Sequence, residues 1–252
     1  MNGLFDLRDK TALITGGRRG IGAALAVGLA QAGVDIAVIG QNDTAGEIEE
    51  AVKKYGRQFY YFQVDLTDRG QREGIVGQVV SKLGRLDILV NNAGYQQFCP
   101  AHEYDLQMWD KDMELLLTSV LDLSQQAYPA MQKQGGGKII HIASISSFQG
   151  ARNIIGYATA KHALIGMTKC MANEWAKDSI NVNAIAPGII ETDMSKGTVG
   201  NPEKAEMIKG RIPSGRFGQP EDIVGTLIFL ASEASSHIHG TVVTVDGGWL
   251  GR

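Results

Sequence analysis

Short apolar runs of strand type alternate with longer stretches of helical periodicity along the whole chain. The strand-type runs lie at 11–15, 35–39, 58–64, 86–90, 138–143, 180–185 and 241–245, and the helical patterns at 23–32, 46–55, 69–83, 106–131, 157–177 and 223–232. The region 106–131 is long enough to be broken near its middle. Strands that alternate with helices form parallel sheets covered on both faces. The pattern therefore predicts one α/β domain over residues 1–252, with helices on both faces of a mostly parallel seven-stranded sheet.

A glycine-rich turn joins the first strand-type run to the first helical pattern and reads Gly16-Gly-Arg-Arg-Gly20-Ile-Gly22. Glycines at such a turn let the backbone approach a pyrophosphate, and the following helix offers free N–H groups and the positive end of its dipole. Because the turn lies in the first strand–helix–strand unit, it predicts a nucleotide site in a Rossmann-type, doubly wound sheet.

The segment 189–215 interrupts this alternation, because it has weak periodicity over more than twenty residues. A long connection at the carboxyl edge of a parallel sheet is more often a functional loop than a structural one. We therefore expect a lid that covers the substrate. The alternative is a surface insertion that contains a short helix at 202–209.

Composition excludes several classes of function. The chain is 44% hydrophobic and 20% charged with a net charge of −3, so it has no basic excess for nucleic acid. No apolar run is long enough to span a membrane, and the first ten residues lack the layout of a signal peptide. The two cysteines, Cys99 and Cys170, lack CxxC or metal-ligand spacing, which favours a reduced cytoplasmic setting without a metal site.

The stretch Tyr157-Ala-Thr-Ala-Lys161 carries the candidate chemistry. In a helix, Tyr157 and Lys161 lie one turn apart on the same face, where an ammonium group would favour the phenolate and make the tyrosine a better acid near neutral pH. A strand-type run ends at Ser144, thirteen residues earlier, and could hydrogen-bond the oxygen that the phenol protonates. The three residues predict an acid site for carbonyl reduction or alcohol oxidation.

Five motifs together resemble the short-chain dehydrogenase/reductase family. They are Thr15-Gly-Gly-Arg-Arg-Gly-Ile-Gly22, Asn91-Asn-Ala-Gly94, Ser144, Tyr157-xxx-Lys161 and Pro187-Gly188, and they occur in the order and at the spacings of that family. The likeness extends from Leu7 to Trp249. Within the family, the runs 147–150, 171–177 and 245–249 are most similar to sugar-acid and polyol dehydrogenases.

The resemblance implies a role for each motif. Tyr157 would be the general acid/base, Lys161 would lower its pKa and hold the nicotinamide ribose, and Ser144 would orient the substrate oxygen. Hydride would pass between nicotinamide C4 and the carbonyl carbon. The implied cofactor contacts come from Gly16, Arg18, Arg19, Gly20, Ile21, Gly22, Asp65, Leu66, Asn92, Ala93, Gly94, Tyr157, Lys161, Pro187, Gly188, Ile190 and Thr192. The resemblance also implies a homotetramer, which agrees with apolar residues on more than one side of the 157–177 helix.

One position departs from the family pattern. Family members usually place an asparagine in the long helix after Asn-Asn-Ala-Gly, where it completes a proton relay, but the corresponding residue is Leu116. One hypothesis is that the main-chain carbonyl near Leu116 still holds the relay water. The other is that Leu116 only packs in the core.

The choice between NAD and NADP stays open. An acidic residue at the end of the second strand would favour NAD, but the family's acidic position falls on Gly40, and Asp43 could lie near. Arg18 could pair with a 2′-phosphate and so favours NADP. The sugar-acid resemblance favours NAD.

The favoured substrate is a sugar acid, keto sugar or related polyol, bound near Gln96, Gln97, Arg152 and Trp249. Two alternatives remain: a reductase of 3-oxoacyl thioesters or general ketones, and a non-catalytic nucleotide-binding module. The presence of both Tyr157 and Lys161 argues against the second. His141 alternates within a strand and is expected to be a packed residue rather than a metal ligand.

Overall fold

Seven parallel strands form a single sheet in the computed structural model, which describes residues 3–251. The strands follow the order β3-β2-β1-β4-β5-β6-β7, so the chain reverses its direction of winding between β1 and β4. Ligands bind at such a reversal, beyond the carboxyl ends of the strands. The strands are β1 (Thr11–Thr15), β2 (Asp35–Gly40), β3 (Phe59–Gln63), β4 (Ile88–Asn91), β5 (Gly137–Ile142), β6 (Ile180–Pro187) and β7 (Val242–Val245).

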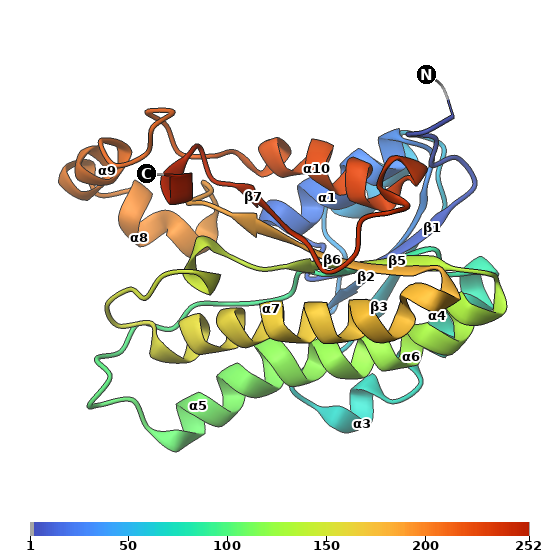
Figure 1. The fold of residues 1–252 in the computed structure, drawn as a ribbon, viewed down its shortest axis with the longest axis horizontal. Coiled ribbons are helices and arrows are strands. Elements are labelled where there is room, and N and C mark those ends of the chain that lie inside the picture. Colours follow the sequence, from blue (N-terminus) through green and yellow to red (C-terminus); the bar gives the residue numbers. More distant parts are fainter. Residues whose placement is uncertain (1–2, 252) are drawn as a thin grey trace.

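Helices cover both faces of the sheet, which confirms the predicted fold class (Figure 1). One face carries α1 (Gly20–Gln31), α2 (Ile48–Lys53) and α10 (Val224–Ala231). The other carries α4 (Ile75–Leu83), α6 (Ser119–Lys133) and α7 (Ile155–Trp175). The central strands β1, β2, β4 and β6 are almost wholly buried, as expected for strands packed on both sides.

Two predicted helices are interrupted. The region 69–83 divides into α3 (Arg69–Arg72) and α4 at Gly74, whose φ of +70° favours glycine. The long region 106–131 divides into α5 (Leu106–Met113), a π-helical turn (Glu114–Thr118) and α6. Arg72 is 1% exposed and joins these parts, because its guanidinium pairs with Glu114 at 2.7 Å and with Asp122 at 2.8 Å.

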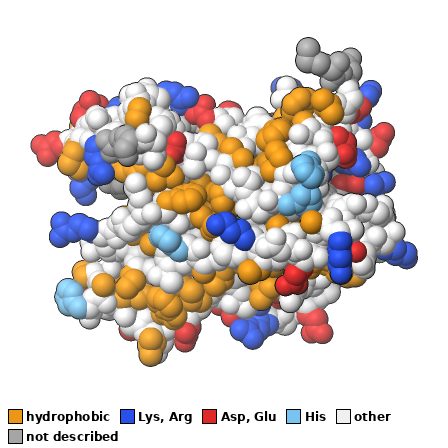
Figure 2. Space-filling view, viewed as in Figure 1, with side chains coloured by type: hydrophobic (Ala, Val, Ile, Leu, Met, Phe, Trp, Pro, Cys, Tyr) orange, Lys and Arg blue, Asp and Glu red, His pale blue; other side chains and the backbone are white. Residues whose placement is uncertain are grey.

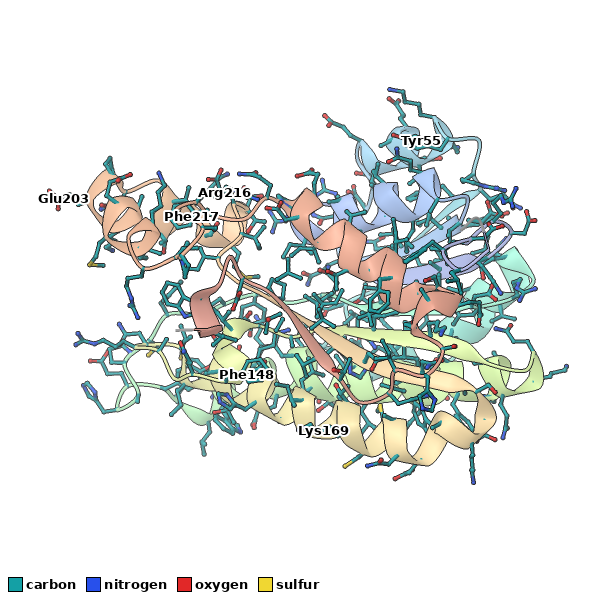
Figure 3. All side chains as sticks on the ribbon, turned by 45° about the horizontal axis from the view of Figure 1, so that its top comes forward. Tyr55, Phe148, Lys169, Glu203, Arg216 and Phe217 are labelled. Carbon is teal, nitrogen blue, oxygen red and sulfur yellow. The ribbon has the colours of Figure 1, made fainter. Side chains whose placement is uncertain are left out.

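The segment after β6 forms a small layer over the carboxyl edge of the sheet. It contains α8 (Lys196–Val199) and α9 (Pro202–Lys209), and the second of these confirms the predicted short helix. Ala205, Ile212, Phe217 and Trp249 form a separate core beneath it. Figure 3 shows Phe217 and Arg216 at the base of this layer and Glu203 at its outer end. None of the helices among residues 3–251 is both long and apolar enough to cross a membrane.

Candidate active site

The predicted motifs converge because parallel strands present their carboxyl ends at one edge of the sheet. The glycine turn follows β1, Asn91 ends β4, and Ser144 follows β5. Pro187 ends β6, and the Gly188 N–H donates to Val245 O at 2.9 Å, which fixes the path of the chain into the lid segment. Segments far apart in the sequence therefore meet at one edge of the sheet.

The glycine turn forms a cradle that fits a pyrophosphate. Gly16 and Gly20 have φ values of +64° and +55°, and a Cβ on Gly22 would overlap Gly16 O and the side chain of Asn92. Ile21 follows Gly20 in the first turn of α1, which carries no acidic residue. The first turn of α1 therefore leaves its N–H groups at the carboxyl edge of the sheet without an acidic side chain of its own to occupy them.

Thr15 begins the glycine motif, and its role in the site was not predicted. Its hydroxyl accepts hydrogen bonds at 2.9 Å from the N–H groups of both Asn92 and Ala93. The Asn92 side chain donates to Thr15 O at 2.9 Å and to Gly16 O at 3.2 Å. These bonds tie the glycine turn to the Asn91–Gly94 loop. The available sequence signal was a hydroxyl residue at the last position of the first strand.

The expected adenine end contains a carboxylate that accepts three hydrogen bonds. Asp65 accepts from Thr67 N at 2.9 Å, from Thr67 Oγ1 at 2.7 Å and from Gln41 Nε2 at 2.9 Å. Partial burial opposes ionisation, but these hydrogen bonds together lower the pKa of Asp65. Leu66 is 6% exposed, so its side chain belongs to the core and only its backbone can border an adenine.

Arg18 lies where a ribose phosphate could meet it. Its Nη1 makes a long bond of 3.4 Å to Asn42 Oδ1, and within residues 3–251 its buried Nε has no hydrogen-bonding partner. At Gly40, a Cβ would lie 2.5 Å from the Tyr61 hydroxyl, so this position has no room for the acidic side chain that favours NAD. The unpartnered donors of Arg18 suit a phosphate. Burial, and then the Asp43 carboxylate, raises the pKa of Tyr61, so an acidic group also lies at this corner.

Ser144, Tyr157 and Lys161 meet at the end of β5. The Ser144 Oγ accepts from Ser146 N at 3.0 Å, which sets its orientation. Lys161 is 5% exposed, its Nζ donates to Ile142 O at 2.6 Å, and the same Nζ lies 5.6 Å from the centroid of the Tyr157 ring. The predicted catalytic trio is therefore assembled by the start of α7 against β5.

The electrostatics of this trio differ from the expectation. Burial raises the pKa of Tyr157, and the hydrogen bond with Ser144 lowers it only in part. Burial also lowers the pKa of Lys161 to about 8. The predicted lowering of the Tyr157 pKa by Lys161 is thus wrong for the protein alone, because withdrawal from water disfavours both the phenolate and the ammonium.

Leu116 lies in the π-helical turn and is 1% exposed. Its Cδ2 would come within 3.0 Å of a Cβ on Gly94, so the side chain packs against the Asn91–Gly94 loop. This contact supports the core-packing hypothesis for the side chain. The relay through a main-chain carbonyl stays a prediction, although π turns commonly leave a carbonyl unpaired and occur at functional sites.

The first residues of the lid segment pack against the glycine turn. A methyl group of Thr192 would contact a Cβ on Gly20 at 3.3 Å, while Ile190 is buried beneath it. Arg19 in the turn pairs with Asp193 at 3.0 Å across this gap. Gly20, Thr192, Asp193, Lys196 and Gly200 line a groove of about 460 Å³, which thus includes two of the cofactor contacts that the resemblance implies.

The four predicted substrate residues come from three segments, and the segments 96–99 and 152–154 are adjacent because Cys99 N donates to Asn153 O at 2.8 Å. Gln96 and Gln97 follow Gly94 and form no side-chain hydrogen bond with any residue in 3–251. Arg152 is exposed and lines a groove of about 950 Å³ together with Ile155, Thr159 and His162. These three residues of α7 lie on the side of the helix opposite to Tyr157 and Lys161. Trp249 is 9% exposed and donates from Nε1 to Gln149 Oε1 at 3.0 Å.

A buried cluster at the start of α7 was not predicted. Asp112 is 1% exposed, accepts a short hydrogen bond from the Tyr104 hydroxyl, and packs against Gly156, where a Cβ would overlap both groups. Burial, followed by the Asp112 carboxylate, raises the pKa of Tyr95. Tyr95 therefore lies near this cluster, and the ammonium of Lys111 on α5 lies 5.9 Å from the centroid of its ring. The cluster holds the residue that precedes Tyr157.

His141 is fully buried, as predicted, and its Nδ1 lies 2.9 Å from Thr168 Oγ1. Burial, and then the charge of Lys161, lowers the pKa of His141 to about 3. The imidazole is therefore neutral below the catalytic trio.

Comparisons with known proteins agree with this geometry. A family profile described as enoyl-(acyl carrier protein) reductase matches residues 16–250. The 2-dehydro-3-deoxy-D-gluconate 5-dehydrogenase of Pseudoalteromonas atlantica is 42% identical over 250 residues, which cover 98% of each chain. A solved structure from Beutenbergia cavernae is assigned as an NAD(P)-dependent gluconate 5-dehydrogenase and contains NADP at low occupancy. It is 40% identical to this chain with a TM-score of 0.94, and the match covers 99% of this chain and 100% of the Beutenbergia chain. The gluconate 5-dehydrogenase of Burkholderia cenocepacia, in complex with NADP and tartrate, is 34% identical with a TM-score of 0.94 and covers 98% of both chains.

Proposed function

This chain belongs to the short-chain dehydrogenase/reductase family, and we propose that it interconverts a carbonyl and a secondary alcohol on a sugar acid, or on a related keto sugar or polyol, with NADP(H). The family resemblance inferred from the five motifs is confirmed, and so is the reaction class, an NAD(P)-dependent oxidoreductase acting on CH–OH groups. The observation that carries the proposal is the meeting of Ser144, Tyr157 and Lys161 beside the glycine cradle.

The residues of the chain account for the proton chemistry. The phenol of Tyr157 donates a proton to the carbonyl oxygen during reduction and accepts it during oxidation. Ser144 hydrogen-bonds the same oxygen and fixes its position. Lys161 supplies positive charge that stabilises the phenolate when Tyr157 is deprotonated. The nicotinamide cofactor supplies or accepts the hydride when it is bound.

Preference for NADP rests on the corner around Arg18. The buried Nε of its guanidinium is an unpartnered donor, and position 40 itself carries no carboxylate that would repel a 2′-phosphate. Two solved relatives contain NADP, which supports the same preference.

The sugar-acid assignment is supported by the similarity to sugar-acid dehydrogenases along the full length of both chains. The residues after Gly94 and the lid at 189–215 would enclose the substrate, within one domain that extends over the whole chain. Free cysteines fit a reducing compartment, and we place the enzyme in the cytoplasm on that basis.

A homotetramer is also proposed. Hydrophobic side chains gather along the lower helical layer in Figure 2, over α5, α6 and α7. They include Leu106 at 78% exposure, Leu121 at 38% and Ile155 at 40%. A helical layer with apolar residues on its outer side packs against a partner, and the mass in solution tests this.

The test of function is a substrate panel assayed with NADH and with NADPH. It contains 2-keto-3-deoxy sugar acids, keto sugar acids, neutral keto sugars and a 3-oxoacyl thioester. We expect turnover of the sugar acids with NADPH above NADH. Preferred turnover of the thioester would replace the substrate assignment, and no turnover of any member would remove the proposal.

A further inference from the structure

Arg211 is an exposed cation of the lid segment that has no acidic partner among residues 3–251. Its neighbours are different, because Lys209 pairs with Glu206 at 3.2 Å and Arg216 pairs with Asp222 at 2.6 Å. The guanidinium carbon of Arg211 lies 4.6 Å from the centroid of the Trp249 ring. Arg211 is thus stacked on an aromatic ring and has no acidic partner among residues 3–251.

Stacking leaves the guanidinium competent to bind an anion. Contact with an aromatic face uses the flat side of the group, while the N–H donors point outward in its plane. That fork matches the two oxygens of a carboxylate. Holding the group flat against a ring also reduces the rotational freedom that it would lose on binding.

The Trp249 ring beneath Arg211 is held by its packing and by a hydrogen bond. Trp249 is 9% exposed and packs in a core with Ile212 and Phe217. Its indole N–H is held by Gln149 Oε1 at 3.0 Å. Arg211 therefore stacks on a ring that belongs to the packed core, although Arg211 itself lies in the lid segment.

The core that contains Trp249 adjoins the loop that carries Ser144. Gln149 lies five residues after Ser144, and Ile145, the residue next to Ser144, packs against the core that contains Trp249. In Figure 3, Phe148 from the same stretch lies below Phe217 of the lid layer. A substrate whose carbonyl is held at Ser144 would extend along this stretch toward Arg211.

The other candidate cation is placed less well. Arg152 lines the groove with Ile155, Thr159 and His162, on the opposite side of α7 from Tyr157. Gln96 and Gln97 are neutral. A sugar acid carries its carboxylate several carbons from the reacting carbonyl and needs a cation at that distance from Tyr157.

From these contacts we infer that Arg211, stacked on Trp249, binds the carboxylate of the substrate and makes the enzyme select acids over neutral sugars. The inference depends on the proposed function for its substrate class. It assigns to Trp249 a supporting part in substrate binding, through Arg211 and Gln149 rather than through direct contact.

The test compares Arg211→Gln and Arg211→Lys with the wild type on one keto sugar acid and on its neutral methyl ester. Loss of a charge-assisted carboxylate contact should lower kcat/KM for the acid about 10- to 100-fold, mostly through KM. The ester should change less than about twofold, and lysine should restore part of the loss because it keeps the charge without the fork. Lys204→Gln is the matched control, since Lys204 is an exposed lid cation without an ion pair among the described residues.

Calorimetric titration of gluconate into the NADP-bound protein separates this inference from the proposed function. Binding that Arg211→Gln weakens tenfold or more, without turnover of any acid in the panel, would retain the anion site and remove the proposed reaction. An equal loss for acid and ester would show that Arg211 only supports the fold of the lid. Unchanged acid kinetics in Arg211→Gln, or no gluconate binding by the wild type, would overturn the inference.

Discussion

Replacing Arg18 with glutamine should weaken NADPH binding and leave NADH binding nearly unchanged. In the structure, the guanidinium makes one long bond to Asn42, at 3.4 Å, and its Nε has no partner among the described residues. It therefore gives up little when it turns toward a phosphate. Glutamine keeps the polarity and much of the length of the side chain but removes the charge.

The expected magnitude follows from the partial exposure of Arg18. A hydrogen bond to a charged group contributes about 1.5–3 kcal/mol, and solvent screening places this site in the lower half of that range. A loss of about 1.5–2 kcal/mol corresponds to a rise of about 10- to 30-fold in the Kd for NADPH. Cofactor fluorescence titrations of NADPH and NADH at one fixed ionic strength measure both values.

Arg19→Gln provides the matched control, because Arg19 lies next in the chain but pairs with Asp193 at 3.0 Å. We expect it to change the two Kd values by similar small factors. If Arg18→Gln weakened both cofactors equally, Arg18 would contact a part that they share. If it weakened neither, the assignment of the 2′-phosphate to this corner would be wrong.

Three further predictions concern the scaffold of the site. Burial lowers the pKa of Lys161 from 10.5 to about 8, so the unfolded chain binds more protons than the folded protein between pH 8 and 10.5. The free energy of unfolding should therefore increase as the pH rises from 8 to 10.5. Urea melts of Lys161→Met should lack this increase. Arg72→Met should reduce the free energy of unfolding by about 3 kcal/mol, since it leaves Glu114 and Asp122 without their buried partner. Arg69→Met should reduce it by less than about 1 kcal/mol, because Arg69 pairs with the same Glu114 at the surface. Equal losses in urea melts would refute the distinction. Gly156→Ala should lower both kcat and thermal stability, because the added Cβ overlaps the Tyr104–Asp112 pair. This loss should exceed the gain of about 1 kcal/mol from the higher helix propensity of alanine. An unchanged kcat would show that this cluster does not position Tyr157.

The order of strands and helices was predictable because each element is specified by its own local periodicity. Placing the glycine turn, Asn91–Gly94, Ser144 and Pro187 at one edge followed from a single inference, since parallel strands carry their carboxyl ends to the same side. The resemblance to a family then supplied roles that periodicity alone could not.

Contacts between distant residues could not be predicted in this way. The π-helical turn at Glu114–Thr118 adjoins the ion pairs of Arg72, which lies more than forty residues earlier. The burial of Asp112 against Gly156 likewise depends on how α5 meets α7. The raised pKa of Tyr157 escaped prediction for a related reason, because the spacing of Tyr157 and Lys161 reveals their proximity but not their withdrawal from water.

The central claim is that Tyr157 carries the proton for hydride transfer, and one variant tests it most directly. Tyr157→Phe keeps the ring in its place and removes only the hydroxyl group. We predict that its turnover of the best substrate in the panel falls by at least about 100-fold, the usual scale of general acid–base catalysis, while the Kd for NADPH stays within about twofold. Turnover equal to that of the wild type, with cofactor binding intact, would contradict the account.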